Sequence, residues 1–111
     1  MSAFRTLLIV LTIAVAGYTL AAVANEGINL LPHFLNPIFA LTWQGQFNLD
    51  FMSYLVLSGV WMAWRGGLTG RSIALGLLAP PLGMPFFAPY LVYLTARTGG
   101  DPRKLLLGVH A

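Results

Sequence analysis

The chain has 111 residues, of which 58% are hydrophobic and 8% are charged, with six basic residues against three acidic ones. Soluble domains carry roughly a quarter charged residues, so this composition excludes an ordinary water-soluble fold and indicates one integral membrane domain. The absence of cysteine excludes disulfides, thiolate catalysis and cysteine-based zinc or iron–sulfur sites.

The first apolar run covers residues 6–24, which contain no charge, follow Arg5 and end before Asn25 and Glu26. About 20 helical residues cross the hydrocarbon core of a bilayer, so this run predicts a first transmembrane helix. A cleaved secretory signal is the alternative, because Ala22-Val23-Ala24 fits a cleavage site.

Residues 28–43 are apolar but interrupted by polar residues and by Pro32 and Pro37. Their apolar side chains recur near helical spacing, which predicts one or two short helices lying in the membrane interface. Residues 47–64 then predict a second transmembrane helix, with Asp50 near its start and Arg65 directly after it.

The third run, residues 72–96, is uncharged but rich in proline and glycine. Proline removes a backbone donor and clashes with the preceding turn, so one unbroken helix is excluded. We expect a proline-kinked third transmembrane helix, with a re-entrant hairpin that breaks around residues 80–85 as the alternative. The predicted fold is therefore all-α, with three transmembrane helices and one interfacial segment.

All basic residues lie outside the apolar runs: Arg5, Arg65, Arg71, Arg97, Arg103 and Lys104. We interpret them as topology markers and lipid-headgroup contacts, not as a nucleic-acid surface. Three straight crossings divide them equally between the two sides, whereas a re-entrant third run places all of them on one side. In both cases we expect the N-terminus and the 65–71 loop in the cytoplasm of a bacterial inner membrane.

Few side chains suggest chemistry. Asp50 buried in a membrane would imply a proton or cation role, but a position in the first turn of its helix is favoured. His33 lacks companion ligands, so no metal site is expected. No nucleophile elbow, phosphate loop or carboxylate pair occurs, so no catalytic residue is predicted.

Aromatic residues beside arginines form two clusters, Trp61 and Trp64 with Arg65, and Tyr90 and Tyr93 with Arg97. They are typical of interfacial anchors, and a lipid, quinone or carotenoid ring is the ligand that they could stack against. Small residues four apart predict close helix packing. These pairs are Gly17 with Ala21, Gly59 with Ala63, and Ala79 with Gly83.

Several short motifs occur between Ala24 and Arg97: Asn25-Glu26-Gly27, Asn36-Pro37, Leu49-Asp50, Trp64-Arg65, and a proline-bearing run that ends in Tyr93 and Arg97. In these features the chain resembles a family of small bacterial membrane proteins classed as a domain of unknown function. The resemblance implies a three-span membrane protein and supplies no catalytic residue.

These observations leave three function classes. The favoured one is a non-enzymatic accessory or structural subunit that packs against other membrane subunits or against copies of itself, surrounded by membrane lipids. The second is a binder of an apolar ligand such as a lipid, quinone or carotenoid. The third is a small oligomeric membrane enzyme or transporter, which requires Asp50, His33 and Glu26 to group at the outer face.

Overall fold

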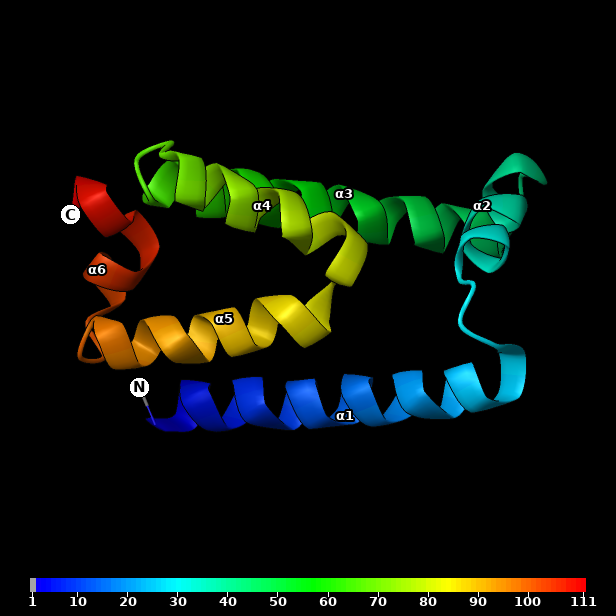
Figure 1. The fold of residues 1–111 in the computed structure, drawn as a ribbon, viewed down its shortest axis with the longest axis horizontal. Coiled ribbons are helices and arrows are strands. Elements are labelled where there is room, and N and C mark those ends of the chain that lie inside the picture. Colours follow the sequence, from blue (N-terminus) through cyan, green and yellow to red (C-terminus); the bar gives the residue numbers. More distant parts are fainter. Residues whose placement is uncertain (1) are drawn as a thin grey trace.

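The computed structural model describes residues 2–111, and in this part of the chain it contains helices and no strand. The helices are α1 (Ser2–Glu26), α2 (Leu31–Phe39), α3 (Trp43–Arg65), α4 (Gly70–Leu82), α5 (Met84–Arg97), α6 (Pro102–Leu107) and the 3-10 helix η1 (Gly108–His110). Figure 1 shows that α1, α3, α4 and α5 run along the long axis, with α2 at one end and α6 with η1 at the other. The predicted all-α class is confirmed.

Within residues 2–111, α1 is the one helix that is both long enough and apolar enough to cross a membrane. The second predicted span becomes α3, which is 23 residues long and begins at Trp43, earlier than expected. Its first turns carry Gln44, Gln46 and Asn48, which dilute its apolar character. Thr42 fixes the start of α3, because its hydroxyl accepts a hydrogen bond from the Gly45 amide at 3.0 Å.

The expected kinked third helix is wrong in shape, and the alternative, a hairpin that breaks around residues 80–85, matches the reversal of the chain. Residues 72–96 form two helices, α4 and α5, which fold back on each other as a hairpin (Figure 1). Gly83 makes the turn with φ of 67° and ψ of −149°, a conformation that side chains disfavour. Pro80 and Pro81 lie at the end of α4 and cannot donate the backbone hydrogen bonds that would continue it. The chain therefore reverses direction where a kink was expected.

Helices α3 and α4 lie side by side, and their backbones meet at two glycines. A Cβ atom on Gly59 would overlap the carbonyl oxygen of Gly76, and one on Gly76 would overlap the carbonyl oxygen of Gly59. Ala63 lies next to the same crossing. Small residues thus allow backbone contact inside this chain, as the predicted pair Gly59 and Ala63 suggested.

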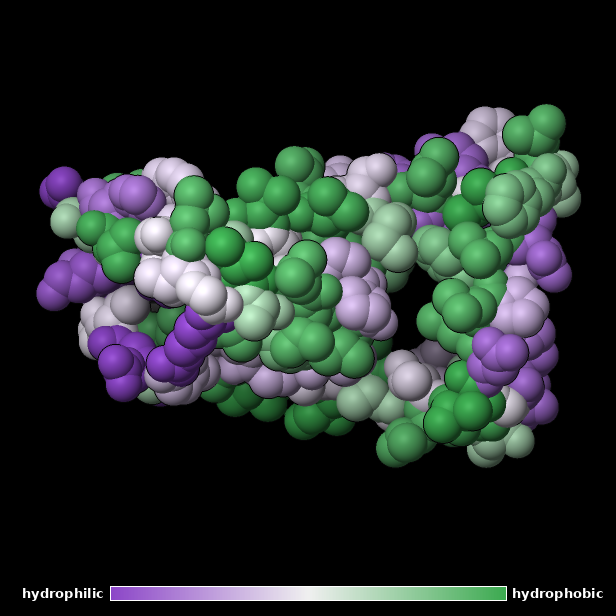
Figure 2. Space-filling view, turned by 45° about the horizontal axis from the view of Figure 1, so that its top comes forward, coloured by the Kyte–Doolittle hydropathy of each residue, from purple (hydrophilic) through white to green (hydrophobic). Residues whose placement is uncertain are grey.

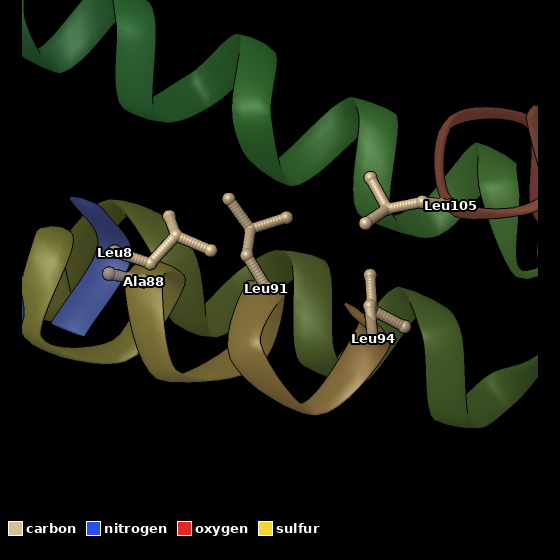
Figure 3. Packing of buried hydrophobic residues seen from close by; sticks show 5 residues of the cluster. All are labelled: Leu8, Ala88, Leu91, Leu94 and Leu105. Carbon is tan, nitrogen blue, oxygen red and sulfur yellow. The ribbon is translucent and has the colours of Figure 1, made fainter. Parts of the chain in front are cut away.

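Helix α5 of the hairpin is held to α1 and α6 by a small apolar cluster (Figure 3). Leu8 of α1, Ala88, Leu91 and Leu94 of α5, and Leu105 of α6 form this cluster, in which Leu8 lies beside Ala88 and Leu105 faces Leu94. Beside it, Arg5 Nε donates a hydrogen bond of 3.1 Å to Thr95 Oγ1, and Thr95 is fully buried. These contacts fix α5 beside the N-terminal half of α1.

The molecule is elongated, with principal extents of 44 × 27 × 23 Å. Figure 2 shows hydrophilic side chains gathered at the two ends of the long axis and hydrophobic ones across the middle. The same view shows an opening between the hairpin and the part of the molecule that contains α2. At one end of the molecule α1, α3, α4 and α5 lie together. Of these four helices, only α1 and α3 continue past the hairpin turn toward the opposite end.

Candidate functional site

The basic residues meet at one end of the molecule, which we call the basic end. It contains the N-terminus of α1, the end of α3, the start of α4, the end of α5, and α6 with η1 (Figure 1). All six basic side chains belong to these segments: Arg5, Arg65, Arg71, Arg97, Arg103 and Lys104. The hairpin causes this clustering, because it returns Arg97 and the following tail to the end where α4 begins.

A tail segment that the sequence analysis did not predict caps the basic end. Helix α6 starts at Pro102, directly after Asp101, whose carboxylate accepts a hydrogen bond of 3.0 Å from the Arg103 amide. Asp-Pro at a helix start is a recognisable signal, since aspartate caps free amides and proline fits the first helical position. Arg65 then binds the tail, with Nε 2.8 Å from the Leu105 carbonyl oxygen and a terminal nitrogen 3.1 Å from that of Lys104.

The two predicted aromatic clusters come together at this end. The ring of Trp61 lies edge-on to those of Phe87 and Tyr90, with centroids 6.0 and 6.5 Å away. Arg65 lies 5.9 Å from the Trp61 ring centre, and Arg97 lies 5.8 Å from that of Tyr93, both within cation–π range.

Trp64 contacts the tail instead of the tyrosines. Its ring stacks on His110 at 4.2 Å between centroids, and the His110 Nε2 atom lies 2.9 Å from the Trp64 carbonyl oxygen. His110 is thereby part of the packing of η1 against α3.

A cleft of about 590 Å³ opens between the end of α3, the start of α4, the end of α5 and the tail. Its basic wall consists of Arg65, Arg71, Arg97 and Lys104, and no acidic side chain lines it. Tyr90 and Tyr93 also face it, beside apolar residues such as Met62, Leu75 and Leu94. We call this the basic cleft. Its volume lies in the usual range of small-molecule sites.

An apolar groove of about 390 Å³ lies elsewhere at the basic end. Phe4, Trp61, Phe87 and Leu91 line it together with Leu57, Ser58, Leu105 and Leu106. The predicted ligand-binding residues therefore divide: Trp61 lines the groove, whereas Arg65, Tyr90 and Tyr93 line the basic cleft.

The remaining predicted site residues lie toward the other end. His33 Nε2 is 3.6 Å from a carboxylate oxygen of Glu26, and both side chains are more than half exposed. Asp50 is exposed in the third turn of α3, so the expected position in the first turn is wrong, because the helix begins at Trp43.

Among residues 2–111 these acidic and histidine side chains do not form a cluster that could hold a metal ion. Within residues 2–111 no three His, Asp or Glu side chains group as metal ligands, and Asp50 makes no side-chain hydrogen bond or ion pair. The enzyme or transporter based on Asp50 stays a prediction that no contact favours.

The predicted small-residue pairs also differ in surroundings. Gly59 and Ala63 lie at the crossing with α4, and Ala79 is fully buried, whereas Gly83 forms the hairpin turn. Gly17 has no atom within 4 Å of the position where a Cβ would lie, and Ala21 is exposed. The pair on α1 is therefore the one without a partner among residues 2–111.

Comparison with family models, curated proteins and solved structures finds no match to this chain. The resemblance to a family of small membrane proteins stays a prediction, and the functional argument rests on the geometry of the chain itself.

Proposed function

We propose that this chain is a non-enzymatic integral membrane subunit and that the outer face of α1 is its packing surface. The observation that carries this proposal is the exposure of α1. Leu8 is the single buried residue among its 25, although the helix is apolar over nearly its whole length. In water such a surface would be strongly unfavourable, whereas in a bilayer it contacts lipid or other helices.

The dimensions and charges support a membrane orientation along the long axis. Helix α1 is about 38 Å long at 1.5 Å per residue, which exceeds the hydrocarbon thickness of about 30 Å. In our proposal α1 and α3 cross the bilayer, α4 and α5 re-enter from the basic end, and α2 lies in the opposite interface. The positive-inside rule then places the basic end, and with it the N-terminus and the 65–71 loop, in the cytoplasm of a bacterial inner membrane.

The outer face of α1 carries the features of a helix-packing surface. Gly17 lies nine residues after Leu8, which is two and a half helical turns and places it on the side opposite α5. Ala21 follows one turn later on nearly the same face. Small residues four apart let two backbones approach closely, and van der Waals packing of that kind drives helix association in lipid. The occupant that we propose is another transmembrane helix.

Photo-crosslinking in native membranes tests this proposal. A benzophenone amino acid replaces Ala21 on the outer face or, as a matched control, Thr19 on the side that Leu8 occupies. We expect a protein adduct at position 21 and none at position 19, and mass spectrometry of the adduct distinguishes a second copy from a different subunit. Lipid adducts alone at both positions, or a protein adduct at position 19 alone, would contradict the proposal.

A second candidate function, binding of an apolar ligand, is favoured by the apolar groove. Its wall of aromatic and aliphatic side chains offers stacking and burial to a lipid chain, quinone or carotenoid. Extraction of the gently purified chain with organic solvent, followed by absorption and mass spectra, tests it. A stoichiometric apolar molecule that is lost in Trp61→Ala supports this function, and a chain free of such a molecule contradicts it.

A further inference from the structure

The basic cleft concentrates positive charge without compensation. Four of the six basic residues of the chain line it, and no acidic side chain does. Like charges that line one cleft repel each other, and water screens part of that repulsion because Arg71, Arg97 and Lys104 are exposed. If Ala111, which also lines the cleft, carries a free carboxylate, that group neutralises one charge and leaves an excess.

The basic side chains divide into one structural residue and three available ones. Arg65 is engaged with the carbonyl oxygens of Lys104 and Leu105. Within residues 2–111 the side chains of Arg71, Arg97 and Lys104 donate no hydrogen bond and lie in no salt bridge, since the single contact of that range joins His33 to Glu26. Arg97 is oriented by its position over the Tyr93 ring. Three strong donors therefore face a shared space and engage no acceptor within residues 2–111.

Other donors face the same space. The phenol groups of Tyr90 and Tyr93 line the cleft, and neither has a hydrogen-bond partner in the described residues. Helix α4 begins at the cleft with Thr69 and Arg71, so its positive end adds to the field of the arginines. An anion with several oxygens is the acceptor that suits such a set, because guanidinium groups bind phosphate through paired hydrogen bonds.

The geometry points to a binding site for a phosphate-bearing anion in the basic cleft, held by Arg71, Arg97 and Lys104. The apolar part of the wall, including Met62, Leu75 and Leu94, favours a phosphate attached to an apolar body. An anionic phospholipid has this chemistry, and free phosphate shares its polar part. The site uses residues remote from the outer face of α1, so it does not depend on the proposed packing function.

Native mass spectrometry of the full chain in detergent measures binding of phosphatidylglycerol, with diacylglycerol as the lipid without phosphate. We expect the double variant Arg71→Gln/Arg97→Gln to weaken phosphatidylglycerol binding by a factor of ten or more, since charge-assisted hydrogen bonds are lost. Arg103→Gln is the matched control, because it removes a charge at the basic end from a residue outside the cleft wall. We expect it to change binding by less than about twofold.

Millimolar inorganic phosphate distinguishes a site for a phospholipid headgroup from a site for free phosphate. A lipid headgroup site keeps phosphatidylglycerol bound in its presence, whereas a site for free phosphate releases the lipid and is stabilised by phosphate alone. Circular dichroism confirms that the variants fold, which we expect because neutral side chains relieve repulsion in the cleft. Equal binding by the double variant and Arg103→Gln, or binding of diacylglycerol as tight as that of phosphatidylglycerol, would overturn the proposal.

Discussion

Single glycines determine how closely the helices approach. Gly59 and Gly76 place the backbones of α3 and α4 in contact, so the carbonyl oxygen of each occupies the space of a Cβ on the other. Gly17 lies in a helix of the same chain with open space around it. A glycine-to-alanine substitution changes helix propensity equally at Gly59 and Gly17. The difference between the two effects on stability therefore measures packing at Gly59.

We expect Gly59→Ala to lower the free energy of unfolding by about 1–3 kcal/mol, because the helices must separate to admit the methyl group. Gly17→Ala should raise it by about 0.5–1 kcal/mol, since alanine loses less backbone entropy in a helix. Thermal unfolding of the monomer in detergent, followed by circular dichroism, measures both. Equal effects of the two substitutions would show that α3 and α4 do not make this contact.

The types and spacing of residues predicted part of the candidate site. Trp61, Arg65, Tyr90 and Tyr93 were predicted from their composition and spacing, and they do lie at one end around the cleft and groove. Arg71 and Lys104 were interpreted only as topology markers and headgroup contacts, and Arg97 was also placed in the cluster with Tyr90 and Tyr93. Their meeting in one cleft depends on the reversal at Gly83, which the sequence pattern did not determine.

At the scale of elements, the decisive feature is the hairpin of α4 and α5. Clustered prolines predicted a break within residues 72–96, but a break fixes neither the angle nor the direction of the next helix. The direction follows from tertiary contacts, with Leu8 of α1 packed on Ala88 and Leu91 of α5. A straight crossing divides the basic residues equally between the two sides, whereas a reversal places all of them on one side, and this was the one sequence signal that favoured reversal.

Accessibility of engineered cysteines tests this element directly, because the natural chain has none. Leu68 precedes α4 and Thr98 follows α5, so the hairpin places both at the basic end. In sealed, oriented vesicles, a membrane-impermeant maleimide should label Leu68→Cys and Thr98→Cys from the same side. Ile28→Cys, in the loop after α1, should label from the opposite side. Labelling of Leu68→Cys and Thr98→Cys from opposite sides would establish a full crossing instead.

At the scale of the whole molecule, the long helices lie along one axis. Figure 1 shows α1, α3, α4 and α5 running along an axis of 44 Å, close to the thickness of about 40–45 Å of a bilayer with its headgroups. The long apolar runs predicted α1 and most of α3, whereas residues 72–96 were expected to form one helix and form two. Their arrangement depends on contacts between segments far apart in the chain.

We expect the helices to align with the membrane normal in supported bilayers. Polarised infrared spectra should show amide I dichroism of steep helices, because α2 and α6 contribute few of the helical residues. Spectra of the same chain in detergent solution, where no direction is preferred, give the isotropic reference. Dichroism of helices lying in the bilayer plane would contradict the proposed orientation.

The hairpin also makes the cross-section of the molecule unequal along its long axis. Four long helices fill the cross-section near the basic end, whereas α1 and α3 alone continue beyond Gly83 (Figure 1). In the proposed orientation, the chain displaces more lipid from one leaflet than from the other, as a wedge does. Acyl chains beside the narrow part must tilt or stretch to fill the volume, which costs elastic energy. Curved bilayers, or neighbours that supply the missing volume, relieve that cost.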